Sequence, residues 1–268
     1  MNLMRGVELV GGRWRKGENI GSLIELVLCK EPLVKINRAC EMGKAAGVAV
    51  TLTHCLKGKV VASASRPADW SLQTDHAAYN SFKDISSWWC EYVLKDINGC
   101  QGWDGTFMSG SVPSLFPKVK MHSINAKEDG STSHGGSYGL DVDIVAENPA
   151  YCAFRNRARF SNVIVNATMA SSSNSGAGVI ASGWGCLDSN FLIQQRGGSQ
   201  AIQIRYQGAS SHTPAVLGSS VIVDAANLSG RVVNIYPRSD GNIQRSALTL
   251  ERIRARGCGS DLITIGEY

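Results

Sequence analysis

The chain has 268 residues, of which 29 are glycine, and charged residues make up 18% of the total. Average proteins contain roughly 7% glycine and roughly 25% charged residues, so this chain has many tight turns and few solvated helices, which favours β structure. The net charge of +5 is mild, and no basic run carries interleaved aromatic residues. The sequence therefore does not indicate a nucleic-acid-binding protein.

Several other classes are also disfavoured. The sequence has no run of about 18 apolar residues, so membrane insertion is not expected. The first residues, MNLMRGVELVGGRW, lack the apolar core of a signal peptide, so export through such a leader is not expected. We found no nucleotide-binding fingerprint and no nucleophile elbow, and we predict no cofactor.

The eight cysteines form no CxxC pair, and their spacing does not suggest a metal site. Three of them, Cys29, Cys55 and Cys186, each follow a glycine by eight positions. Small residues buried at a turn explain this recurrence better than metal ligands or disulfides do. We therefore predict free thiols, no bound metal and assembly in a reducing cytoplasm.

In chain order, residues 5–14 already alternate apolar and polar positions, and a repeat follows. Gly21 and Gly47 each begin an alternating apolar strand, and Cys29 or Cys55 stands eight residues later, before a short turn and a second strand. The repeat length is 26 residues, because 47 − 21 = 26. A unit this short cannot bury its own apolar face, so it must stack on copies of itself. This predicts an all-β fold, a right-handed single-stranded parallel β-helix with lateral loops.

The remainder of the chain continues the pattern. Polar or glycine-rich segments at about 66–78, 99–117 and 125–137 are predicted as lateral loops, and strands are expected between and after them. The glycine-led frame returns at Gly139 and Gly178, with Glu147 in the place of the cysteine in the first of these. We predict one domain over residues 1–268.

The strand that follows Gly139 carries a candidate pair of acids. Its apolar residues alternate, so Asp141 and Asp143 should share the outer face, about 6.6 Å apart along the strand. That separation suits an acid and a base, or a nucleophile, in glycoside cleavage, with Glu147 as a third member. An ordinary solvated strand face explains the same residues.

The next strand, CAFRNRARF, places Arg155, Arg157 and Arg159 at alternate positions, and ERIRARG repeats this with arginines at 252, 254 and 256. Guanidinium groups in a row bind carboxylates or phosphates in two-pronged fashion, which suits an acidic polysaccharide. The alternative is that the arginines keep the surface soluble and block edge pairing. Arginine beside aspartate also admits a lyase, a less favoured reading because no further carboxylates cluster there.

Glycine-flanked tryptophans suggest surfaces on which a sugar ring stacks. Trp103, followed by Asp104, and Trp184 have this setting. Trp70, Trp88 and Trp89 are instead expected to pack against the stack or a subunit contact.

Coils at 21–36, 47–62, 139–154 and 178–193, with the phrase YNSFKDI at 79–85, resemble the pectate-lyase-like right-handed β-helices and, among them, bacteriophage tailspikes. The resemblance implies a homotrimeric virion protein of the phage tail, attached to other tail proteins and assembled in the host cytoplasm. It further implies binding and hydrolysis of a bacterial surface polysaccharide, such as capsule or lipopolysaccharide. A non-catalytic virion structural or adhesion subunit is the alternative.

Overall fold

The computed structural model describes residues 4–15, 22–40, 48–65, 80–106, 113–134, 137–170, 176–182, 187–205, 218–236, 248–259 and 262–265. Every regular element among these residues is a β-strand, and two ten-stranded parallel sheets hold all but two of the strands. No described segment forms a helix of the length and apolarity that crossing a bilayer requires.

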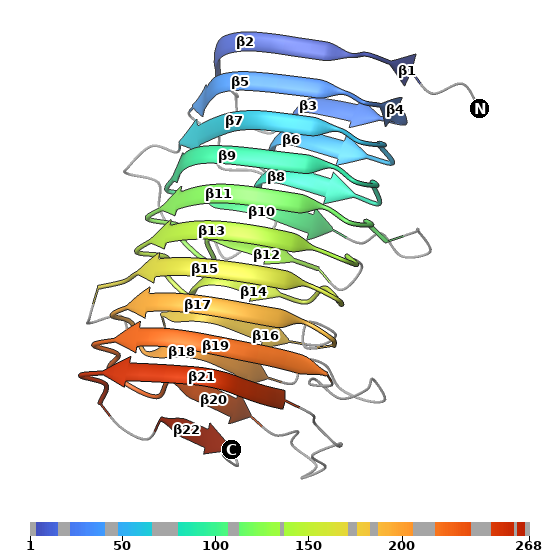
Figure 1. Ribbon diagram of the computed structural model, residues 1–268. Coiled ribbons are helices and arrows are strands. Elements are labelled where there is room, and N and C mark those ends of the chain that lie inside the picture. Colours follow the sequence, from blue (N-terminus) through green and yellow to red (C-terminus); the bar gives the residue numbers. More distant parts are fainter. Residues whose placement is uncertain are drawn as a thin grey trace.

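The front sheet of Figure 1 runs, in order, through β2 (Glu8–Arg15), β5 (Leu33–Cys40), β7 (Lys59–Ser65), β9 (Glu91–Asn98), β11 (Lys118–Ile124), β13 (Asp141–Glu147), β15 (Asn162–Thr168), β17 (Asn190–Arg196), β19 (Ser219–Ala226) and β21 (Leu248–Arg256). The back sheet consists of β3 (Ser22–Val27), β6 (Val48–Thr53), β8 (Asn80–Ile85), β10 (Gln101–Thr106), β12 (Ser131–Ser133), β14 (Cys152–Asn156), β16 (Ala177–Ser182), β18 (Gln200–Arg205), β20 (Val233–Tyr236) and β22 (Ile263–Ile265). The short strands β1 (Met4–Arg5) and β4 (Cys29–Lys30) pair beside them.

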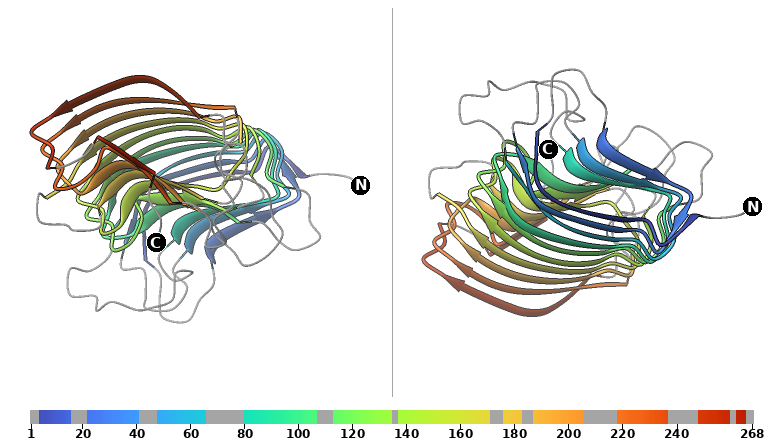
Figure 2. Two further views of the ribbon diagram at one scale, coloured as in Figure 1. Left: turned by 90° about the horizontal axis from the view of Figure 1, so that it is seen from below. Right: turned by 90° about the horizontal axis from the view of Figure 1, so that it is seen from above.

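Successive strands alternate between the two sheets, so each circuit of the chain adds one strand to each sheet. Viewed down the stack in Figure 2, the front-sheet strands superpose along one side and the back-sheet strands along the other. The predicted parallel β-helix is confirmed. The coil length is not constant: Leu33 pairs with Lys59 after 26 residues, Lys59 with Glu91 after 32, and Asp141 with Asn162 after 21.

The core is the column of side chains between the sheets. In β13 every second residue is buried, and Val142, Ile144 and Ala146 face inward. The next strand repeats this, so that Val142 lies beside Val163 and Ile144 beside Val165. Because the side-chain period of a strand is two, the intervening polar residues all lie on the outer face of the front sheet.

The corners of the coil depend on residues in the left-handed backbone region. At one corner, asparagine takes this conformation at Asn125, Asn148 and Asn227, with glycine at Gly197. Asn and Gly adopt it at the lowest cost, and the Asn148 side-chain amide donates to Asn125 Oδ1 at 3.5 Å, linking adjacent corners. These residues turn the chain sharply while keeping each coil in register with the next.

The glycine frame of the sequence analysis is only half correct. Gly21 and Gly47 lie outside the described residues, but the strands after them pair in register, Ser22 with Val48, in the back sheet. Gly139, by contrast, precedes β13 of the front sheet, and Gly178 lies inside β16. Glu147 is therefore not equivalent in position to Cys29 and Cys55, because coils of unequal length shifted the frame.

Two of the predicted loops are partly strand. Strand β10 lies inside 99–117, and β12 lies inside 125–137, and both belong to the back sheet. Gly102 is required for close packing and not for a turn, because a Cβ there would overlap Met121 Sδ. Ser131 is fully buried, and its hydroxyl accepts a hydrogen bond from the Trp103 backbone N–H at 3.0 Å, which satisfies a polar group in the core. The loop predicted at 66–78 lies outside the described residues.

The prediction of free thiols is confirmed for the six cysteines that the structure describes. None forms a disulfide, and five are buried. Cys29 and Cys55 stack at the same corner, since their neighbours Lys30 and Leu56 form a parallel bridge. Burial raises the pKa of Cys55 to about 11, so this thiol stays protonated at neutral pH and is unreactive.

Candidate functional site

The outer face of the front sheet carries rows of polar side chains that cross the strands. Asn166 of β15 lies in register with Gln194 of β17, and Gln194 with Asp224 of β19. Arg254 of β21 continues the same row. Adjacent strands are about 4.8 Å apart, so this polar row presents one amide, carboxylate or guanidinium group at each such step along the solenoid.

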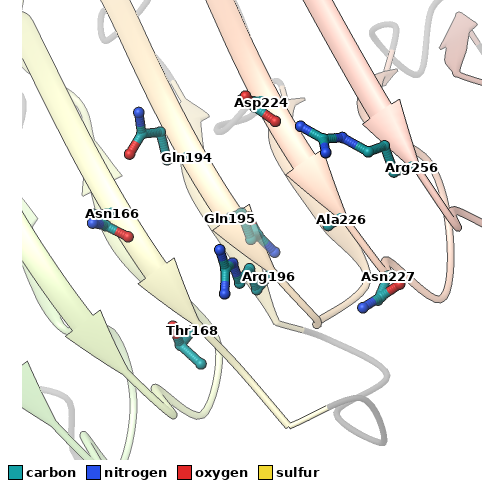
Figure 3. Close-up of a pocket in the computed structure, with 9 residues that line it drawn as sticks. All are labelled: Asn166, Thr168, Gln194, Gln195, Arg196, Asp224, Ala226, Asn227 and Arg256. Atoms are coloured by element: carbon teal, nitrogen blue, oxygen red, sulfur yellow. The ribbon is translucent and has the colours of Figure 1, made fainter.

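Around this row the surface is hollowed into a polar groove of about 580 Å³ (Figure 3). The residues that line it are Asn166, Thr168, Gln194, Gln195, Arg196, Asp224, Ala226, Asn227 and Arg256. They come from the carboxyl-terminal halves of β15, β17, β19 and β21 and from the corner after β19. Nearly all are hydrogen-bonding side chains, so the groove suits a ligand covered with hydroxyl and charged groups better than an apolar one.

A charged row leads into the groove from β13. Glu147 lies in register with Thr168 at the groove's margin. Glu147 Oε1 lies 3.0 Å from His122 Nε2, and Asp96 Oδ1 lies 2.9 Å from His122 Nδ1. Partial burial lowers the pKa of His122, but the hydrogen bonds to Glu147 and Asp96 outweigh it, and the net effect raises the pKa above its usual value.

The structure places the predicted acids on the outer face, as the alternation required. Asp141, Asp143 and Glu147 are all exposed in β13. Asp143 Oδ2 lies 3.8 Å from the Lys120 ammonium on the neighbouring strand. Asp141 and Asp143 are not among the residues that line the groove, whereas Glu147 borders it through Thr168. The carboxylate that lines the groove is Asp224.

The first residue of the predicted arginine row, Arg155, belongs to the other sheet, and the other two follow the end of β14. Arg155 is on the outer face of β14, where its guanidinium is bound by Asp129, with Nη2 3.0 Å from Oδ1. Arg157 Nη1 donates to His134 Nδ1 at 3.1 Å. Arg159 pairs with Tyr138 at a corner. These three arginines therefore do not face the acids of β13.

Asp104 joins the same back-sheet cluster as Arg157. Its Oδ1 lies 3.2 Å from His134 Nε2. Burial lowers the pKa of His134, more than Asp104 raises it, so the imidazole is neutral at pH 7. Its Nδ1 accepts a hydrogen bond from Arg157, and its Nε2 faces the Asp104 carboxylate. Because Nδ1 is occupied and Nε2 carries the proton of the neutral ring, His134 is not available as a base.

Trp103 lies in the core with no exposed surface and packs against Tyr92, with ring centroids 6.0 Å apart. The prediction of a sugar-stacking surface at Trp103 is wrong, because the flanking glycines allow close packing of the strand and do not expose the ring. Trp184 lies outside the described residues. Trp88 and Trp89 lie at a corner, where Trp89 is 52% exposed.

That corner carries a row of aromatic rings, which we call the aromatic corner: Trp89, Phe116, Tyr138 and Phe160. Trp89 stacks on Phe116 at 5.3 Å and 19°, and Tyr138 packs on Phe160 at 4.6 Å. Phe116 and Phe160 are 40% and 43% exposed. Phe116 and Tyr138 meet edge to face, at 6.2 Å and 88°, so the four rings do not form one flat surface on which a sugar could stack.

Comparison of the chain with protein-family models, with curated proteins and with solved structures found no match. Within the described residues, no group of three or more His, Cys, Asp or Glu side chains is placed to hold a metal ion. The class of ligand that suits the groove is therefore inferred from the side chains that line it.

Sequence reasoning missed the polar row of the groove, although a signal was present. The strand phrases NVIVNAT, NFLIQQR and SVIVDAA place Asn166, Gln194 and Asp224 at the same position after an apolar triplet. Alignment of these three strands would have shown one polar position in each of three successive coils.

Proposed function

We propose that this protein is a phage tailspike-like protein that binds a bacterial surface polysaccharide, capsule or lipopolysaccharide, in the polar groove of its front sheet. The observation that carries the proposal is the polar row from Asn166 through Gln194 to Asp224, which repeats along the solenoid at the strand spacing. A linear polysaccharide also repeats its hydrogen-bonding groups at nearly regular steps along one axis.

The chemistry of the groove supports this ligand class. Amide side chains such as Gln194 both donate and accept, which matches vicinal hydroxyl groups, while Asp224 accepts from two hydroxyls at once. The groove crosses four strands, so it spans three strand spacings, about 14 Å. That length accommodates a short run of sugar units and not a single monosaccharide.

Binding measurements with groove variants test the proposal. Capsules and lipopolysaccharides from a panel of bacteria would be immobilised, and affinities compared for wild type, Gln194→Ala and Asp224→Ala. Each lost hydrogen bond should weaken the best ligand by about 1 kcal/mol, or about fivefold. Gln203→Ala, which removes an amide from the back sheet, is the matched control and should bind normally. Binding by wild type that both groove variants retain in full would refute the groove assignment.

Hydrolysis of the bound chain is a second proposal, and the position of Glu147 beside the groove margin favours it. In this reading Asp141 and Asp143 act as acid and base, or as nucleophile, with Glu147 in support. The acid protonates the leaving glycosidic oxygen and the base takes a proton from the attacking water, so that water is added across the broken bond. A lyase mechanism remains the less favoured version.

Release of reducing ends from the polysaccharide that binds best tests this step. Asp141→Asn and Asp143→Asn should each lower cleavage at least a hundredfold without weakening binding. No cleavage by wild type would leave the non-catalytic adhesion subunit as the function. Cleavage that both variants retain would exclude this pair as the acid and base.

The assembly proposed with this function is a homotrimer on the phage tail, attached to other virion proteins and assembled in the host cytoplasm. The buried free thiols support assembly in a reducing compartment. The exposed rings of the aromatic corner supply a surface for a subunit contact, so sedimentation of wild type against Trp89→Ser would test whether this corner takes part.

A further inference from the structure

A second row of side chains crosses the groove next to the polar row, and it contains a gap. Arg196 of β17 lies in register with Ala226 of β19, and Ala226 with Arg256 of β21. All three line the groove. A methyl group thus stands between two strands that each carry a long arginine side chain, and nothing longer than this methyl group rises from β19 at this row; in Figure 3 the Arg256 guanidinium extends from β21 toward Asp224.

The charges around this space favour an anion. Arg196 and Arg256 are exposed, and within the part of the chain that the structure describes neither forms an ion pair. Arg155 on the back sheet differs, because Asp129 occupies its guanidinium. Arg254 on β21 adds a further positive charge close by, against the single carboxylate of Asp224 that lines the groove.

We infer that the space over Ala226 is the subsite for an anionic substituent, a uronate carboxylate, a sulfate or a phosphate, of an acidic polysaccharide. The inference rests on the proposed function. Arg196 and Arg256 stand on the two strands that flank Ala226, and guanidinium groups suit planar, two-pronged recognition of such oxyanions. Asp224, one row away, accepts hydroxyls and repels a second anion, so it fixes which sugar of the repeat occupies the space.

The other explanation for these arginines is that they keep an exposed sheet face soluble. That explanation requires no small residue at 226 and no particular position for each charge. It predicts that replacing any arginine on this face affects binding equally, whereas an anionic subsite predicts that Arg196 and Arg256 matter most. This difference distinguishes the two explanations.

The test uses two matched pairs of polymers: polygalacturonate with its carboxyl-reduced form, and dextran sulfate with dextran. Wild-type protein should bind at least one anionic member about tenfold or more tightly than its neutral partner, and rising NaCl should weaken that preference. Polygalacturonate and dextran sulfate distinguish a carboxylate from a sulfate as the preferred group.

Three variants assign the preference to the subsite. Arg196→Gln and Arg256→Gln should each reduce it about tenfold, and Ala226→Leu should do the same by filling the space. Arg38→Gln removes an equal charge from β5 of the same sheet and should leave it unchanged. Melting curves identify any variant that has lost its fold.

Equal binding of the anionic and neutral polymers, with groove variants that still weaken both, would overturn the anionic subsite and leave polysaccharide binding intact. An anionic preference that falls equally in Arg38→Gln would overturn it in favour of general charge. Binding to no polymer in either this set or the bacterial panel would overturn the proposed function itself.

Discussion

Asp84 is a carboxylate inside the core, and its ionisation should destabilise the protein at neutral pH. It occupies an inward position of β8, in register with Leu52 of the preceding coil, and has no exposed surface. Its oxygens accept hydrogen bonds from Ser114 Oγ at 2.9 Å, Tyr92 OH at 3.0 Å and the Ser87 amide at 3.3 Å. Burial nevertheless raises the pKa of Asp84 to about 6, because these donors only partly replace water.

The size of this destabilisation follows from the linkage between protonation and folding. In the unfolded chain Asp84 ionises near 3.8, but in the folded chain it ionises near 6. Its contribution to stability is therefore full below about pH 3.8 and is lost as the pH rises through about 6. Each pH unit of that interval costs about 1.36 kcal/mol, so the total cost at pH 7 is about 3 kcal/mol.

Asp84→Asn removes the titrating group and keeps the shape of the side chain. The variant loses hydrogen-bond acceptors, which costs about 1 kcal/mol at every pH, but it should gain about 3 kcal/mol relative to wild type between pH 4 and pH 7. Urea unfolding followed by tryptophan fluorescence at several pH values measures this difference.

Asp141→Asn is the matched control, because Asp141 is an exposed carboxylate on β13. Parallel stability curves for wild type and Asp84→Asn between pH 4 and pH 7 would show that Asp84 is ionised in the fold at no cost, and the reasoning about its burial would be wrong.

Two further predictions concern packing and the His122 pair. Trp103→Ala should lower the free energy of unfolding by about 3 to 5 kcal/mol, because it leaves a cavity in the core. Trp89→Ala, at the exposed corner, should lower it far less. Urea unfolding compares the two variants, and equal losses of stability would contradict the placement of Trp103 in the core. The raised pKa of His122 means that its ion pairs stabilise the fold fully below about pH 6.5 and lose this effect as the pH rises through the folded value. An NMR titration should show that Glu147→Gln lowers the pKa of His122, and an unchanged pKa would exclude this partner.

The fold was predictable because the signal is local and repeated. Alternation within a strand fixes which residues face inward, so the outward placement of Asp141 and Asp143 followed from Val142 and Ile144 alone. The buried, unpaired cysteines followed from their recurrence at one point of the coil. None of these inferences depends on the number of residues between two coils.

The candidate site was less predictable, because a site on a solenoid is assembled across coils. Asn166, Gln194 and Asp224 become neighbours only through the register of β15, β17 and β19, and that register depends on the lengths of intervening turns. The frame shift that placed Glu147 in the position of a cysteine has the same cause. Trp103 was misplaced because glycine serves both in turns and in tightly packed strands, and the sequence does not distinguish these uses.

The sequence by itself determined the all-β solenoid and the inward or outward direction of residues in clearly alternating strands such as β13, because both depend on a period of two within a few residues. Only the tertiary structure decided that Arg155 lies on a different sheet from the acids, and that Arg196 and Arg256 flank Ala226. Lateral neighbours are set by strand pairing between coils of unequal length, and that pairing is a property of the whole stack.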